Sequence, residues 1–197
     1  MATMKESITT STSLLKVTLD TNCVINLMDT TAQTPTSVVE LIELMRLGLS
    51  HVVDIAVTTR AEDDLLKDKD PKRRDDMLRM LGVFPIVGTI VRWGVSRWGS
   101  GDVYGGDDTA KLSQEIQRVV FPSLSATDKR RGNKLNDVDH LVGHRIQGRN
   151  VFVTDDGDIL KKADALRSQF GIVVQTPETC LAHIHALEAA RLSPLPQ

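Results

Sequence analysis

The sequence lacks three features that mark large classes of protein. It has no run of the roughly 18 apolar residues that a membrane span needs, because polar and helix-breaking residues interrupt its apolar stretch 83–95. Its two cysteines are too few for a disulfide framework, which fits a reducing compartment. Its net charge of -2 argues against a protein that coats nucleic acid by bulk charge. We therefore expect a soluble, cytoplasmic protein without membrane contact, whose contacts with nucleic acid are local.

The chain length favours a single α/β domain. With 197 residues, one such domain can bury a substantial core. Residues 1–13 are rich in Ser and Thr and lack the apolar run of a secretory signal, so we predict a flexible tail there. The domain itself is predicted over 14–190, with an insertion at about 88–134 and a second short tail at 191–197.

Apolar runs alternate with amphipathic segments along the domain. Short runs at 14–19, 52–57, 151–154 and 172–175 predict buried strands, and 83–87 predicts an edge strand at best because it contains Pro85. Helical spacing follows at 38–48, 59–67, 75–81, 109–120, 136–147 and 158–169, with a last helix opened by Thr176 and Pro177. The order predicts a three-layer α/β/α sandwich with a central, mainly parallel sheet.

Helix starts carry recognisable capping sequences. Ser37 with Glu40, and Thr59 with Glu62, have the spacing of a capping box. Asp107 or Asp108 suits the N-cap of the helix that follows the insertion's Gly-rich part. These patterns predict where the helices begin.

Four acidic residues lie where a parallel sheet brings distant segments together. Asp20, Asp137 and Asp156 follow strands or begin helices, and Glu62 opens the helix after the second strand. The carboxyl ends of parallel strands and the adjacent helix starts share one edge of the sheet, so these acids are expected to converge. Clustered carboxylates repel one another unless their pKa values rise or a hard cation neutralises them. Oxygen ligands suit Mg²⁺ or Mn²⁺, which predicts metal-dependent phosphodiester hydrolysis.

Each acid taken alone also has a structural explanation. Glu62 is the third residue of a capping box, and Asp137 and Asp156 suit N-caps. Asp20 is harder to explain in this way, because an acid that directly ends an apolar strand is costly to bury unless it is hydrogen-bonded or binds something. The order of all four acids along the chain carries the prediction.

Four short stretches resemble the PIN-domain family of metal-dependent nucleases. They are Leu19-Asp-Thr-Asn22, Glu62, Asp137-Val-Asp-His-Leu141 and Phe152-Val-Thr-Asp-Asp-Gly-Asp-Ile159. The resemblance spans about 14–178 and is absent across 88–134. It implies acids that bind Mg²⁺ or Mn²⁺ and cut RNA, which fall on Asp20, Glu62, Asp137 and Asp156. It also implies that Asn22 and Thr154 orient those acids.

The identity of two of these acids depends on spacing. Asp139 competes with Asp137 for the third position, and we prefer Asp137 because it gives the Asp-x-x-His-Leu pattern that the family uses. Asp155 and Asp158 crowd the fourth position, but the Thr-x-Asp spacing selects Asp156.

A doubled Arg-Trp-Gly, at 92–94 and 97–99, marks the insertion. Trp93 and Trp98 would stack bases while the arginines contact phosphate, or they would pack a hairpin or an oligomer contact. Basic clusters at 72–74 and 129–131 are explained by surface solvation when each is taken alone. His140 and His144 lie one helical turn apart, but without a further ligand this spacing is more simply accidental.

Together these features predict an endonuclease that hydrolyses single-stranded RNA, with DNA left open as a substrate. The alternatives are a catalytically silent PIN-like module that binds RNA or protein, and a phosphatase or receiver-like domain with Asp20 as nucleophile. The resembled family includes toxins that pair with antitoxins, so an antitoxin-like protein partner stays open, as does a homodimer.

Overall fold

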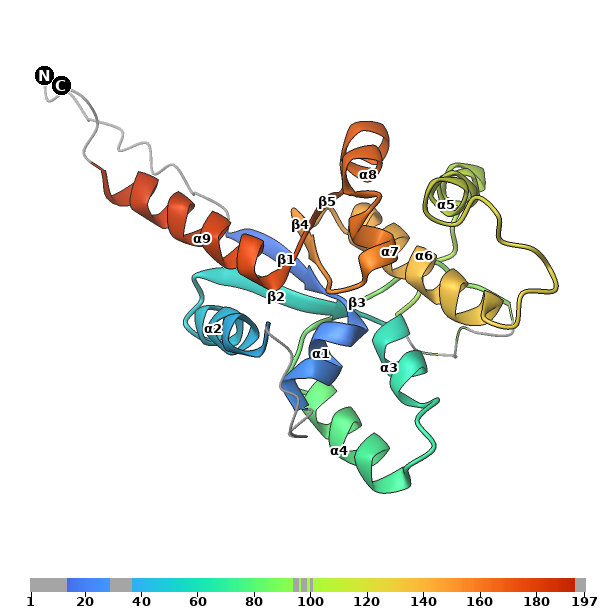
Figure 1. The fold of residues 1–197 in the computed structure, drawn as a ribbon, viewed down its shortest axis with the longest axis horizontal. Coiled ribbons are helices and arrows are strands. Elements are labelled where there is room, and N and C mark those ends of the chain that lie inside the picture. Colours follow the sequence, from blue (N-terminus) through green and yellow to red (C-terminus); the bar gives the residue numbers. More distant parts are fainter. Residues whose placement is uncertain (1–13, 29–36, 94–95, 97–98, 100, 194–197) are drawn as a thin grey trace, which may run out of the picture.

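The computed structural model describes residues 14–28, 37–93, 96, 99 and 101–193. A five-stranded sheet in the order β3-β2-β1-β4-β5 runs through the centre, and every neighbouring pair of strands is parallel (Figure 1). The strands are β1 (Leu15–Leu19), β2 (Val53–Thr58), β3 (Ile86–Val87), β4 (Val151–Val153) and β5 (Val173–Gln175). This arrangement confirms the predicted α/β/α sandwich, and β3 is an edge strand as Pro85 led us to expect.

Helices cover both faces of the sheet. They are α1 (Thr21–Met28), α2 (Val38–Leu49), α3 (Arg60–Leu65), α4 (Pro71–Leu81), α5 (Asp107–Val120), α6 (Arg131–Ile146), α7 (Gly157–Leu160), α8 (Ala163–Phe170) and α9 (Pro177–Leu192). One apolar core joins one face of the sheet to α1, α2, α4 and α9, and a second joins the other face to α5, α6, α7 and α8. Figure 1 shows these two groups of helices on opposite sides of the strands.

Alternation along the strands fills both cores. In β1, Val17 and Leu19 belong to the core under α2 and α9. Thr18 points to the other face of the sheet, where its Oγ1 forms a 2.9 Å hydrogen bond with Nδ1 of His144 in α6. In β4, Phe152 lies in the second core and Val153 in the first. Successive side chains of a strand point to opposite faces, so short strands covered on both sides read as continuous apolar runs.

Several helix boundaries follow the signals in the sequence. Thr176 caps α9 by accepting a hydrogen bond from the Thr179 amide at 3.2 Å, and Pro177 occupies the first helical position. Gly171 ends α8 with a φ of 68°, a left-handed conformation that favours glycine.

Other boundaries differ from the prediction. Neither predicted capping box forms, because the Ser37 hydroxyl donates to Asp155 and the Thr59 hydroxyl donates to Asp102. Helix α4 begins at Pro71, α5 at Asp107 and α6 at Arg131, each earlier than predicted, and α9 extends to Leu192. Asp137 therefore lies inside α6 and not at its start.

The predicted insertion contains two different parts. Helix α5 packs against α6 and α8 and contributes Ile116 and Val120 to the second core, so it belongs to the domain's own layer. The described residues of the preceding stretch, 88–93, 96, 99 and 101–106, form an arm in which the Val91 amide donates to the Val103 carbonyl at 2.9 Å. Within the described residues, no helix is long and apolar enough to cross a bilayer.

A close backbone approach fixes the base of the arm. A Cβ placed on Gly88 would lie 2.0 Å from the carbonyl oxygen of Gly101, whereas one placed on Gly132 in α6 would meet nothing within 4 Å. We predict that Gly88→Ala lowers the free energy of unfolding by about 1–3 kcal/mol, because the backbone must move apart. Gly132→Ala is the control and should be neutral or stabilising by up to about 1 kcal/mol. Urea unfolding measures both, and equal effects of the two variants would contradict this account of the arm.

Candidate active site

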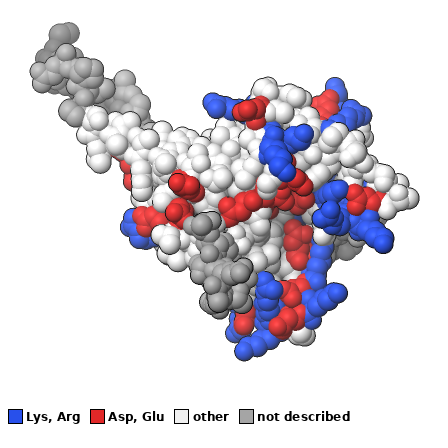
Figure 2. Space-filling model, in the orientation of Figure 1, with Lys and Arg blue, Asp and Glu red and all other residues white. Residues whose placement is uncertain are grey.

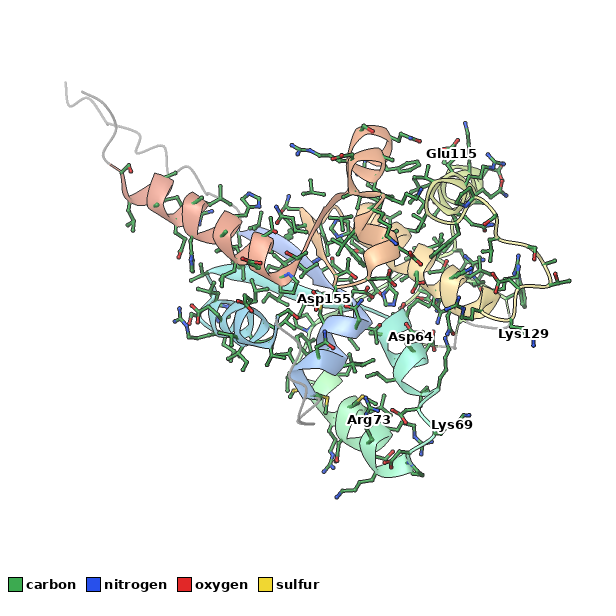
Figure 3. All side chains as sticks on the ribbon, viewed as in Figure 1. Asp64, Lys69, Arg73, Glu115, Lys129 and Asp155 are labelled. Carbon is green, nitrogen blue, oxygen red and sulfur yellow. The ribbon has the colours of Figure 1, made fainter. Side chains whose placement is uncertain are left out.

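A cavity of about 360 Å³ opens at the carboxyl edge of the sheet, between α1, α3, α4, α6 and the start of α7. Five acids line it: Asp20 after β1, Asp64 from α3, Asp68 after α3, Asp137 from α6 and Asp156 before α7. Figure 3 labels Asp64 where α3 approaches this edge. Three of the four acids named from the sequence therefore share one cavity, although Asp20 lies more than a hundred residues before Asp137 and Asp156 in the chain.

Asp20 is the most tightly held of these acids. Its side chain is 5% exposed, and its Oδ1 accepts a hydrogen bond from the Thr21 amide at 2.7 Å. Its Oδ2 accepts from Asn22 Nδ2 at 2.9 Å and from Thr154 Oγ1 at 2.6 Å. Burial raises the pKa of Asp20, although the charge of His140 and the hydrogen bonds from Thr154 and Thr21 oppose the rise. Asn22 and Thr154 thus fix the orientation of a carboxylate at the end of β1.

Thr154 also connects Asp20 to Asp156. Its hydroxyl oxygen accepts a hydrogen bond from the Asp156 amide at 2.9 Å, while the hydroxyl hydrogen goes to Asp20. The Asp156 carboxylate caps α7 through Oδ1, which accepts from the Asp158 amide at 2.6 Å and the Ile159 amide at 3.3 Å. Asp156 is therefore both an N-cap and a wall of the cavity, so the structural and functional interpretations of this residue do not exclude each other.

The acid that α3 contributes to the cavity is Asp64, and Glu62 is not among the lining residues. Residues two apart on a helix point about 200° apart, so only one of this pair faces a given neighbour. Ala61 and Leu65 mark the buried face of α3, and Glu62 and Asp64 flank that face at similar angles on opposite sides. The apolar pattern therefore does not distinguish them, and packing against α6 selects Asp64.

Asp64 is saturated with hydrogen bonds. Its Oδ1 accepts from Asn136 Nδ2 at 2.7 Å and Lys67 Nζ at 2.8 Å, and its Oδ2 lies 3.2 Å from Thr21 Oγ1 and 3.1 Å from His140 Nε2. Burial favours the neutral acid, but the hydrogen bond and charge of His140, with Lys67 and Asn136, outweigh it and lower the pKa of Asp64. This carboxylate stays ionised, with all its acceptor positions in use.

His140 is the buried counter-charge of the cluster. The side chain is completely inaccessible, with Nδ1 at 2.6 Å from Thr58 Oγ1 and Nε2 at 3.2 Å from Thr21 Oγ1. Burial disfavours its protonated form, but the hydrogen bond to Asp64 and the charges of the nearby carboxylates outweigh burial and raise the pKa of His140. His144, one turn later in α6, has other partners: its Nδ1 lies 2.9 Å from Thr18 Oγ1, and its ring packs edge-on against Phe152.

Asp137 carries the uncompensated negative charge. Its carboxylate receives no hydrogen bond from any described residue, in contrast to Asp20 and Asp64. Burial, followed by repulsion from Asp20, raises the pKa of Asp137 to about 7, although His140 opposes the rise. A carboxyl in this setting gains from any cation that approaches it.

Asp139, the competing third acid, serves a different purpose. It is 0% exposed and accepts from Arg60 Nε at 3.0 Å and from the Arg92 guanidinium. Arg60 is also fully buried, and its remaining N–H groups bind Asp63, Asp102, the Ile90 carbonyl and Ser96. The structure therefore places Asp137 in the cavity and Asp139 in a buried ion-pair network that joins α3, α6 and the arm.

The donor set of the cavity fits a hard divalent cation. Asp20, Asp137 and Asp156 supply oxygen only, and the buried imidazole of His140 is already hydrogen-bonded to Asp64. Oxygen ligands and excess negative charge are what Mg²⁺ or Mn²⁺ requires. Within the described part of the chain, no three His, Cys, Asp or Glu side chains are already arranged to hold a metal ion, so binding requires the carboxylates to draw together.

The aromatic residues of the arm are only partly described. Trp93 is 92% exposed and Tyr104 is 77% exposed. Trp98 and Arg97 lie outside the described residues. Arg92, predicted as a phosphate contact, is instead engaged with Asp139.

Comparison with known proteins assigns no family to this arrangement. No protein-family model matches the chain, and no curated protein is significantly similar to it. A function must therefore be inferred from the geometry of the cavity.

Removing the charge of Asp137 should stabilise the protein at high pH. The folded-state pKa of Asp137 is about 7, above the unfolded value of 3.8. The free energy of unfolding therefore falls as the pH rises from about 4 to about 7, and the whole destabilisation by the Asp137 charge is present above pH 7. This shift corresponds to at most roughly 4 kcal/mol. We expect Asp137→Asn to be more stable than the wild type at about pH 8 in EDTA, with a smaller difference near pH 5. Thermal melts at both pH values, with and without Mg²⁺, measure this. A variant less stable than the wild type at the higher pH contradicts the charge argument.

Asp139→Asn should have the opposite effect. The change leaves two arginines without their shared carboxylate, one of them fully buried. Breaking a buried ion pair from one side costs about 3–5 kcal/mol, so urea unfolding should show a loss of that order. Equal stability of Asp137→Asn and Asp139→Asn would show that their environments do not differ as described.

Proposed function

We propose that this protein is a metal-dependent endonuclease of the PIN-like kind, which hydrolyses phosphodiester bonds in RNA. The main support for this proposal is that Asp20, Asp137 and Asp156 come from three separate segments and line one cavity. In that cavity, no described residue donates a hydrogen bond to the Asp137 carboxylate. A purely structural cluster would compensate each carboxylate, as happens at Asp64. An uncompensated acid beside two others is instead typical of a cation site.

The cavity acids and the residues that orient them would have different roles in hydrolysis. A divalent cation held by Asp20, Asp137 and Asp156 would stabilise charge on the scissile phosphate and lower the pKa of the attacking water. Asn22 and Thr154 hold the Asp20 carboxylate in one orientation. Water supplies the hydroxyl that adds to phosphorus, the ribose oxygen leaves with a proton, and no covalent bond to the enzyme forms.

Positive charge flanks the acidic cavity on two sides. Figure 2 shows acidic atoms across the centre of this face, with basic groups over α4 and over the start of α6. In Figure 3, Lys69 and Arg73 lie below Asp64 and Lys129 lies to its right. Lys67 lines the cavity itself. A phosphate backbone crossing the acids would meet cations before and after the cleaved bond, which suits local binding by a protein of negative net charge.

The alternative functions receive less support. A silent binding module has no need for a partly buried carboxylate without a described hydrogen-bond donor, such as Asp137. A phospho-aspartate mechanism at Asp20 is disfavoured because both its carboxylate oxygens already accept hydrogen bonds.

Asp20→Asn tests the proposal directly. With an end-labelled single-stranded RNA and Mn²⁺, we expect the wild type to produce internal cuts and the variant to lose at least about a hundredfold in rate, because electrostatic stabilisation of the transition state is lost. Asp158→Asn is the matched control, because Asp158 is an exposed acid two residues from Asp156 whose carboxylate pairs with Lys161. It should cut at the wild-type rate. Cleavage that survives EDTA or Asp20→Asn would sink the proposal, and a DNA strand run in parallel determines the sugar preference.

A further inference from the structure

Trp93 is presented to solvent in a way that packing does not explain. Its side chain is 92% exposed, and it is the most exposed of the large apolar side chains that the structure describes. Aromatic residues make up only 4% of the chain. An indole has a large apolar surface, which a folded protein normally buries unless the ring is used for binding. The predicted role in packing a hairpin therefore does not apply to this ring.

Two described residues near Trp93, Arg92 and Ser96, are held by hydrogen bonds. The Arg92 side chain binds Asp139, and the Arg92 amide donates to Ser96 Oγ at 2.8 Å. Ser96 Oγ in turn accepts from Arg60 Nη2 at 2.9 Å, and the same nitrogen donates to the Ile90 carbonyl at 2.8 Å. The segment that carries the exposed indole is thus attached to a fully buried arginine, which limits the entropy lost when the ring binds something.

The same attachment places the arm beside the acidic cavity. Arg60 lies four residues before Asp64 in α3, and Asp139 lies two residues after Asp137 in α6. A helix rises only about 1.5 Å per residue, so both anchors lie within one turn of a cavity acid. Arg60 and Asp64 lie on the same side of α3, whereas Asp139 and Asp137 point to different sides of α6.

We propose that Trp93 stacks on an unpaired base of the strand that enters the acidic cavity, so that the preferred substrate is single-stranded. The proposal rests on the proposed nuclease function. Base-to-aromatic stacking tolerates any sequence, and bases in a duplex are already stacked and unavailable. The exposed basic cluster 129–131 opens α6, where it would contact the phosphates of the same strand. A second exposed ring, Tyr104, follows Val103, which is bridged to Ile90 in the same arm.

Tryptophan fluorescence isolates the stacking step from cleavage. A protein with Trp98→Phe retains Trp93 as its sole tryptophan, and Asp20→Asn prevents turnover. We expect saturable quenching when a short oligouridylate is added, and none with a strand of equal phosphate count that lacks bases or with a blunt RNA duplex. Equal quenching by the abasic strand would mean that the ring senses phosphate or a conformational change, which overturns the proposal.

Cleavage kinetics provide a second readout. In the otherwise wild-type chain, Trp93→Ala should raise KM for single-stranded RNA about tenfold with a smaller effect on kcat, since one stacked base is lost. Trp93→Phe should recover most of that loss. Leu192→Ala removes another exposed apolar side chain, on α9, and should change nothing. An unchanged KM in Trp93→Ala, or dissociation of an oligomer by that variant in sedimentation, would overturn the proposal, the latter in favour of a protein contact.

The two experiments separate this inference from the proposed function. Quenching by oligouridylate in a protein that never cuts RNA would leave the stacking role standing and remove the nuclease. Cutting without quenching, and with a normal KM in Trp93→Ala, would remove only the stacking role.

Discussion

The buried ion pair between Arg60 and Asp139 determines how α3 and α6 face each other. Both side chains are fully inaccessible, and the Nε to Oδ2 distance is 3.0 Å. Once Asp139 is turned toward Arg60, Asp137 must point to another flank of α6, and once Arg60 is turned toward α6, Asp64 and not Glu62 faces the cavity. The same guanidinium holds the arm through Ser96. One interaction therefore selects two of the cavity acids and positions the exposed indole.

The acids of the cavity differ in how far neighbouring groups compensate their negative charge. His140 compensates Asp64, and Asn22 and Thr154 compensate Asp20, so the negative charge that is left concentrates on Asp137 and on the free side of Asp156. Burying such a charge is costly, and the fold tolerates it at the one edge where segments from both ends of the chain meet. The neighbouring acids Asp20 and Asp64 both accept hydrogen bonds, which makes Asp137 informative, because uncompensated groups concentrate at functional sites.

Sequence patterns predicted the architecture well because strand and core signals are local. The runs that became β1, β2, β4 and β5 are apolar on both faces, as strands covered by two helical layers must be. Capping signals succeeded where the hydroxyl or carboxylate had no competing partner, as at Thr176 and Asp156. They failed at Ser37 and Thr59, whose hydroxyls reach acids distant in the sequence. A local pattern does not reveal such long-range competitors.

What the amino-acid sequence determined by itself was the layered fold, the position of Asp20 at the end of the first strand and the order of the acids along the chain. Those follow from periodicity and from the polarity of strand ends, which neighbouring residues decide. Only the tertiary structure decided between Glu62 and Asp64, assigned Asp139 to Arg60, and buried His140 among the carboxylates. Each of those choices depends on how a helix is rotated against its neighbour, and residues far apart in the chain set that rotation through packing and ion pairing.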